Sequence, residues 1–381
     1  MSTKPSSVAS AGPDVQLLLR LTASILKHSA ISAPGVDDEV DWQQVAVLAH
    51  RHRVVPLIWD NLSKRSDVDL PEWLVDDFKS TYHKNALHGL RVTFHLFRLV
   101  AALSAEGIPV LPLKGVCLAA CYYRSVAARY AGDIDLIVPA ENLDRADAVL
   151  RRLRYRRIAN STRAIVLEPF NEDTDFRLHY IYVSPDGVPI ELHFRLHKNP
   201  DILAVDIAKV IAEGLKVSIG GKTLPIMPAD LQFVFLATHG ARHEWVRLQW
   251  VCDIALMLDR AGPDIIGEWM MTAARYSLTN PVVQAMVLAH RFLGVALPPD
   301  AQRAYARSRR IRFMVRRGEQ ALLRLEERKQ DRPATSAASF DFGRRLYRLC
   351  ISSRPIYLWH EMRNVTKAIL VRFTKSTAML F

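Results

Sequence analysis

Residues 132–139 read Gly-Asp-Ile-Asp-Leu-Ile-Val-Pro, so that two aspartates open an otherwise apolar run. Such a run is typical of a buried β-strand, and the two-residue period of a strand places the carboxylates of Asp133 and Asp135 on one face. Unpaired carboxylates are costly to bury, so the pair indicates a bound divalent cation. The same spacing at 67/69 and 173/175 lies in polar, turn-like sequence and gives no such indication.

The sequence before this strand predicts another strand, a turn and a helix. Residues 108–113 are apolar apart from two prolines, Lys114-Gly115 follows, and a helical pattern covers 116–123. A glycine at a helix start lets the backbone approach a ligand, and the free N–H groups of the first turn favour a phosphate. The alternative is a glycine that only turns the chain.

The sequence after the strand predicts a helix and a β-hairpin. One face of 141–153 is apolar at helical spacing, and strands over 176–183 and 188–194 flank the turn Ser184-Pro185-Asp186-Gly187. Glu191 on the last strand is a third carboxylate, suited to complete a metal site or to accept the proton of an acceptor hydroxyl.

Basic residues near these strands have two interpretations each. Arg129 could neutralise phosphate charge, or it could pair with the two aspartates. The arginines between 151 and 157 lie where the helix over 141–153 ends, and we interpret them as balancing the helix dipole in preference to contacting nucleic acid.

Two histidines stand four residues apart in the helical sequence after 227. His239 and His243 share one helix face, which suits zinc, but no Glu follows the first His and no third ligand is evident. We therefore interpret His239, His243, Arg242 and Arg247 as lining a substrate cleft or as making hydrogen bonds between helices.

The remaining sequence is helical in pattern. We predict a loose tail over 1–14, a helical N-terminal region over 15–106, a mixed α/β core over 107–226 and a helical C-terminal region over 227–381. The fold class is α+β, a core of mixed sheet and helices flanked by two helical regions.

Composition and charge limit the class of protein. The 381 residues are 50% hydrophobic, which predicts a folded chain, and neither a secretion signal nor an uninterrupted apolar run of ~18–20 residues is evident, so we expect no membrane span and a cytoplasmic location. The four cysteines follow no zinc or disulfide spacing and predict buried thiols.

The net charge of +12 is concentrated after residue 300. Residues 301–381 contain 19 Lys plus Arg against 6 Asp plus Glu, a charge of +13. Such a tail can bind a protein partner, an anionic membrane surface or nucleic acid, or be a solvated helical face. Mixed basic and apolar runs at 309–317 and 369–373 favour helices that cover a core.

These motifs together resemble the polymerase-β-like nucleotidyltransferase superfamily, and within it a bacterial family of uncharacterised nucleotidyltransferases. The matching residues are Leu113-Lys114-Gly115, Arg129, Gly132-Asp133-Ile134-Asp135-Leu136, Glu191-Leu192-His193, the pair His239 and His243, and Asp253-Ile254. The resemblance covers about 110–258. Lys-Gly stands where the DNA polymerases of the superfamily have Gly-Ser, so the phosphate contacts do not carry over directly.

The resemblance implies a nucleotidyltransferase with a polymerase-β-like core. It implies two Mg²⁺ ions on Asp133, Asp135 and Glu191, and a nucleoside triphosphate, with ATP as the expected donor, bound at Lys114, Gly115 and Arg129. Candidate substrate contacts are His193, His239, Arg242 and His243. The acceptor would be a hydroxyl of a small molecule, a natural-product intermediate or a protein, with pyrophosphate released.

Two other functions are compatible with the same residues. One is a non-catalytic, nucleotide-binding regulatory or antitoxin-like scaffold whose basic tail binds a protein partner. The other is addition of nucleotides to RNA, which the basic tail suggests. The sequence shows no interleaved aromatic residues or RNA-binding motif, so nucleic acid is not the expected partner.

Overall fold

The sheet of the computed structural model shows how the two predicted strands and the hairpin come together. The structure describes residues 11–26, 40–64, 70–158, 179–197, 199, 201–323 and 342–362. Five strands form one sheet in the order β1-β2-β5-β4-β3. Their bounds are β1 Leu111–Pro112, β2 Ile134–Ile137, β3 Arg156–Ile158, β4 His179–Val183 and β5 Pro189–His193.

The sheet is mixed, as the α+β prediction requires. Strands β2 and β5 run parallel, with Asp135 opposite Glu191, while the other three pairs are antiparallel. All four residues of β2 are buried, because the strand is central and covered on both faces. The predicted hairpin is confirmed as β4–β5, and its expected first residues, 176–178, lie outside the described residues.

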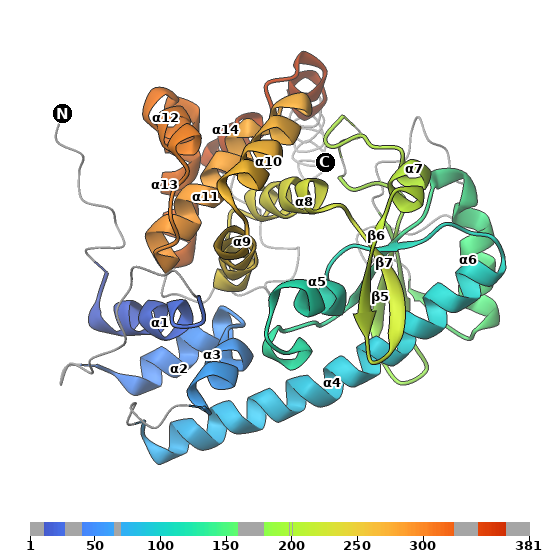
Figure 1. The fold of residues 1–381 in the computed structure, drawn as a ribbon, viewed down its shortest axis with the longest axis horizontal. Coiled ribbons are helices and arrows are strands. Elements are labelled where there is room, and N and C mark those ends of the chain that lie inside the picture. The colour runs from blue at the N-terminus through green and yellow to red at the C-terminus, as the bar shows by residue number, and fades with distance from the viewer. Residues whose placement is uncertain are drawn as a thin grey trace, which may run out of the picture.

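Helices α4 (Glu72–Ala105) and α6 (Leu143–Arg152) cover one side of this sheet (Figure 1). Their buried residues join those of β2 and β5 in one hydrophobic cluster. The predicted helix over 141–153 begins with a 3-10 turn, η2 (Ala140–Asn142), and the strand predicted over 108–113 is reduced to Leu111–Pro112. The helix predicted over 116–123 is α5, Gly115–Tyr122.

A second hairpin and a short edge strand were not predicted. The hairpin is β6 (Leu215–Ile219) and β7 (Lys222–Ile226), joined by Gly220 and Gly221, both with positive φ. It follows α7 (Ile207–Ala212). Strand β3 lies in the arginine-rich stretch, where alternation is too short to be recognised beside the charges.

The N-terminal and C-terminal helices share a single core. Buried residues of the first three helices cluster with those of the helices after 227. The bounds are α1 Pro13–Ala23, α2 Trp42–Arg51, α3 Val55–Leu62, η1 Val126–Ala128, α8 Ala229–Arg242, α9 Leu248–Arg260, α10 Pro263–Arg275, α11 Thr279–Leu293, α12 Pro299–Arg307, α13 Arg309–Leu323 and α14 Phe342–Leu349. The molecule therefore has two cores, and α4 extends along both (Figure 1).

Within the described part of the chain, α4 is the one helix long and apolar enough to cross a membrane. Its best window has a mean hydropathy of 1.2 and is 33% buried, and a core helix of a soluble protein passes the same test. The exposed residues Leu87, Leu90 and Phe94 supply much of its apolar character. The absence of a membrane span stays a prediction.

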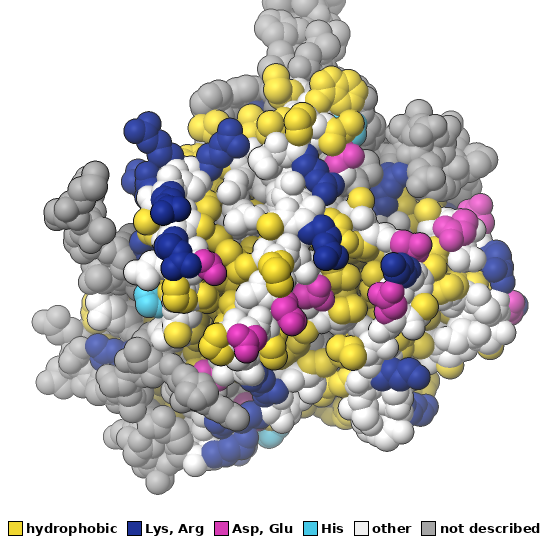
Figure 2. Space-filling model, turned by 45° about the horizontal axis from the view of Figure 1, so that its top comes forward, with side chains coloured by type: hydrophobic (Ala, Val, Ile, Leu, Met, Phe, Trp, Pro, Cys, Tyr) yellow, Lys and Arg dark blue, Asp and Glu magenta, His cyan; other side chains and the backbone are white. Residues whose placement is uncertain are grey.

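The basic region after 300 is partly built into the fold. Helix α13 buries Ile311, Met314 and Val315, which confirms the core-covering interpretation of 309–317, whereas 369–373 lies outside the described residues. Arg317 and Arg344 both pair with the buried Glu244. Other Lys and Arg side chains gather at the upper left of Figure 2, on the side where Figure 1 has α12 and α13.

Candidate active site

Three carboxylates converge on one cavity of about 290 Å³ between the two cores. Asp135 and Glu191 are register partners on adjacent parallel strands, and Asp133 immediately precedes β2, so a two-residue step brings it to the same cavity. All ten residues that the resemblance assigns to the site line this cavity: Lys114, Gly115, Arg129, Asp133, Asp135, Glu191, His193, His239, Arg242 and His243.

Lys114 follows directly on β1, and β1 pairs with β2. The Leu113 N–H donates to the Asp135 carbonyl at 3.0 Å, and this places the Lys114 ammonium 3.2 Å from Asp135 Oδ2. Gly115 begins α5 with φ +66°, a conformation that favours glycine, and a Cβ there would lie 3.7 Å from the Asp133 carbonyl. Among the described residues no side chain caps α5, which leaves the N–H groups of its first turn without a side-chain acceptor there.

His193 lies between the two strand carboxylates. Its Nε2 is 3.1 Å from Asp135 Oδ1 and 3.2 Å from Glu191 Oε2. His179 is its cross-strand partner on β4, with Nδ1 3.6 Å from Glu191 Oε2. The sequence analysis missed His179, although its place in the predicted hairpin opposite His193 was a usable signal.

The pKa values in the cavity reflect crowded negative charge. Burial and the neighbouring Asp135 carboxylate raise the pKa of Asp133 to about 6. Burial would raise the pKa of Asp135 too, but the Lys114 ammonium and the His193 hydrogen bond hold it well below its usual range. Burial lowers the pKa of His193, but the carboxylates of Asp135 and Glu191 outweigh this effect and raise the pKa above its usual value.

The donor set fits a divalent metal. Three carboxylates around one cavity offer the hard oxygen ligands that Mg²⁺ prefers. A second set is mixed: His179, Glu191 and His193 have ligand atoms within 4.8 Å of one another, a nitrogen and oxygen combination that suits a transition metal.

Arg129 is engaged away from the aspartates of the cavity. Its buried guanidinium donates from Nε to Asp253 Oδ1 at 2.8 Å and from Nη2 to Oδ2 at 2.9 Å. The Tyr123 hydroxyl donates to the same Oδ1 at 2.6 Å. The sequence allowed Arg129 either to contact phosphate or to pair with Asp133 and Asp135. The structure contains an ion pair, but its acidic partner is Asp253 on α9. Arg129 thus ties the chain ahead of β2 to the helical core, while one edge of it lines the cavity.

Helices α8 and α9 form the opposite wall. His239 and His243 pack their rings 4.7 Å apart and both lie against Trp250. Burial and nearby cations lower both pKa values, that of His243 to about 4, so both rings are neutral near pH 7. Gln249 donates from Nε2 to the Tyr130 carbonyl at 2.9 Å, and its buried Oε1 has no partner among the described residues.

A family model described as an uncharacterised nucleotidyltransferase matches residues 38–294. No curated protein matches the chain. Similar solved structures include the antibiotic-resistance factor ANT(2'')-Ia, with 16% identity over 49% of this chain and 91% of that chain and a TM-score of 0.34. Another is an antigenic nucleotidyltransferase-like protein from Paracoccidioides brasiliensis, with 15% identity over 53% and 93% of the two chains and a TM-score of 0.33.

Proposed function

Because the chain belongs to this nucleotidyltransferase family, we propose that it moves a nucleoside monophosphate from a nucleoside triphosphate to a hydroxyl group, with release of pyrophosphate. The observation that supports this most is the convergence of Asp133, Asp135 and Glu191 on one cavity beside an uncapped helix start. The polymerase-β-like, two-metal form of the reaction belongs to the proposal.

The three carboxylates would hold Mg²⁺. Two bound ions would neutralise charge on the attacking and leaving oxygens of the displacement. The chain's own part is to position: the register of β2 and β5 sets Asp135 opposite Glu191, and Lys114 and His193 balance the carboxylate charge. Hydrogen bonding from His193 lowers the pKa of Glu191 against the effect of burial, so this carboxylate is ionised and can accept the proton of an acceptor hydroxyl.

The triphosphate would lie at the start of α5. The N–H groups of the first turn and the positive end of the helix dipole favour phosphate oxygens, and the Lys114 ammonium stands beside them. Arg242 on the facing wall adds a cation to the same cavity. The donor we propose is ATP. The Oε1 of Gln249 can accept a hydrogen bond from an exocyclic amino group, which adenine, guanine and cytosine have and uracil lacks.

The acceptor in this proposal is a small molecule, a natural-product intermediate or a protein, and the site of action is the cytoplasm. A protein partner could bind the basic helices after 300, and no nucleic-acid partner is proposed. One observation favours a non-catalytic scaffold: Lys114 and His193 already occupy the carboxylates of Asp135 and Glu191. Such a scaffold would bind a triphosphate without releasing pyrophosphate.

The test is label transfer by the purified protein with Mg²⁺, each of the four labelled ribonucleoside triphosphates, and extract of the cells that make it. Transfer should be lost in an Asp133→Asn, Asp135→Asn double variant and kept in Asp264→Asn, which changes an exposed carboxylate on α10. Undiminished turnover in the double variant would refute the role of the aspartates. Triphosphate binding without transfer would favour the scaffold.

A further inference from the structure

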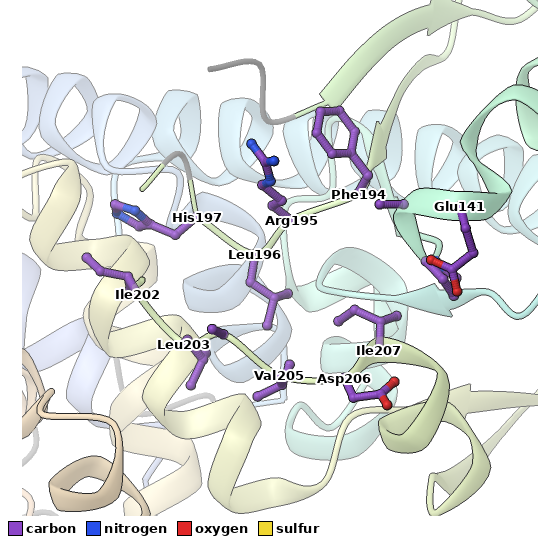
Figure 3. A pocket seen from close by; sticks show the side chains of 13 residues that line it. Glu141, Phe194, Arg195, Leu196, His197, Ile202, Leu203, Val205, Asp206 and Ile207 are labelled. Carbon is purple, nitrogen blue, oxygen red and sulfur yellow. The ribbon is translucent and has the colours of Figure 1, made fainter. Parts of the chain in front are cut away.

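A second cavity, of about 420 Å³, lies just beyond the carboxyl ends of β2 and β5 (Figure 3). It is lined by the segment after β2, residues 139–141, and by the connection from β5 to α7, residues 194–197 and 202–207. Leu196 lines both this cavity and the active-site cavity. The two spaces therefore lie on either side of one side chain.

The strands that carry the catalytic carboxylates lead directly into this cavity. Strand β5 ends at His193, and Phe194 is the first residue of the cavity wall. From Asp135 to Pro139 the chain spans about 13 Å at the rise of a strand. A molecule with its body in the cavity and one hydroxyl at Glu191 would need a length of the order of 10 Å, which two or three fused or linked rings provide.

Polar and apolar groups contribute equally to the lining. Leu196, Ile202, Leu203 and Ile207 are buried hydrophobic residues of this wall. Leu203 has φ +50°, a conformation that a bulky residue adopts only under constraint. Strain of this kind concentrates at ligand sites.

Polar residues are also part of the lining. His197 accepts a hydrogen bond at Nδ1 from the Asn199 N–H at 3.0 Å, so its Nε2 carries the ring proton. The buried Nε2–H of His197 has no partner among the described residues. Burial, followed by the charge of Arg242, lowers the pKa of His197 to about 3, which keeps the ring neutral. Figure 3 shows the carboxylates of Glu141 and Asp206 on the side away from His197.

We propose that this cavity binds the body of the acceptor, a small molecule with a partly apolar ring framework that carries amine or hydroxyl donors toward the carboxylates of Glu141 and Asp206. The inference rests on the proposed function. The volume lies in the range of small-molecule sites. Two carboxylates against the single cation of Arg195 disfavour a polyanion such as RNA.

The bound acceptor would present its hydroxyl to Glu191. The hydroxyl oxygen forms a bond to the α-phosphorus of the triphosphate while its proton passes to the Glu191 carboxylate. The bond from the α-phosphorus to the bridging oxygen breaks, and pyrophosphate leaves with that electron pair.

The test fills the cavity without touching the carboxylates. Val205→Trp places an indole in the space, and Ala204→Trp does so from its exposed rim, so that one variant remains if the other fails to fold. Val47→Trp is the matched control, because Val47 lies on α2 at 50% exposure and lines neither cavity. Folding is checked by circular dichroism and thermal unfolding.

Two measurements separate this proposal from the proposed function. Equilibrium dialysis against the under-3-kDa fraction of cell extract, read by mass spectrometry, should find a hydroxyl compound retained by the wild type and by Val47→Trp, with retention at least tenfold lower in the cavity variants. Label transfer to that compound should fall equally, with Mg²⁺–triphosphate binding unchanged. Retention without any transfer in the wild type would contradict the proposed function alone. Equal retention by all variants, or label found only on protein or RNA, would overturn the acceptor cavity.

Discussion

The ion pair between Arg129 and Asp253 should be among the most strongly coupled interactions in the molecule. Their side chains are 5% and 1% exposed, and two hydrogen bonds of 2.8 and 2.9 Å join them. Removing one partner of a buried pair leaves a charge without compensation, at a cost of about 3–5 kcal/mol. Arg129→Met and Asp253→Leu should each lower the free energy of unfolding by that amount, about a fifth or more of the stability of an ordinary protein.

The double variant should lose far less than the two single variants added together. It removes both charges of the pair, and the main remaining defect is the Tyr123 hydroxyl without its acceptor, worth about 1–3 kcal/mol. The coupling energy should therefore exceed about 3 kcal/mol. Urea unfolding followed by the fluorescence of the seven tryptophans measures all four free energies. Additive losses would refute the reasoning, because they would mean that neither charge depends on the other.

Three further predictions concern stability and donor choice. His52 is buried and neutral, with a pKa lowered to about 3 by burial and by Arg51 and Arg247, so its stabilising effect is complete above pH 6.5 and is lost as the pH falls toward 3. Between pH 7 and pH 4.5 protonation of His52 should lower the free energy of unfolding of the wild type by about 2.5 kcal/mol. Urea unfolding at the two pH values should therefore show a fall that is smaller by that amount in His52→Asn. An equal fall in the two proteins would contradict the role of His52. Gly240→Ala would place a Cβ 2.5 Å from the buried ring of Trp245 and should lower the free energy of unfolding by about 1–3 kcal/mol or more. Gly89→Ala on α4 is the control: its Cβ would meet nothing within 4 Å, and the free energy of unfolding should rise by about 0.5–1 kcal/mol in the same assay. The reverse order of the two variants would exclude the packing argument. Gln249→Leu should weaken ATP binding about 2- to 12-fold in equilibrium dialysis and leave UTP binding unchanged, and equal effects on both would remove Gln249 from base recognition.

The core of the fold was predictable because its signals are local. The apolar run after Asp133, the Ser184–Gly187 turn and the helical period of 141–153 each specify an element without reference to the rest of the chain. The ten candidate site residues follow from the same motifs, and they line one cavity. Their assigned chemical roles stay predictions.

What the sequence could not supply depends on contacts between distant segments. Nothing near Arg129 indicates that its partner is Asp253, which lies 124 residues away and is placed by the packing of α9. The division into an N-terminal and a C-terminal helical region follows chain order, whereas α1, α2 and α3 share a core with the helices after 227. The second cavity is formed by a connection without helical or strand period, so no pattern predicts it.

The place of the active-site cavity between the two cores suggests how distant parts of the chain contribute to the site. The sheet core supplies the carboxylates and Lys114, and the helical core supplies His239, Arg242 and Gln249, so a bound triphosphate would contact both. The Arg129–Asp253 pair joins the chain ahead of β2, on the sheet side, to α9 of the helical core. A conservative Arg129→Lys change keeps the charge but cannot make the two parallel hydrogen bonds, and it should therefore weaken triphosphate binding more than it weakens folding.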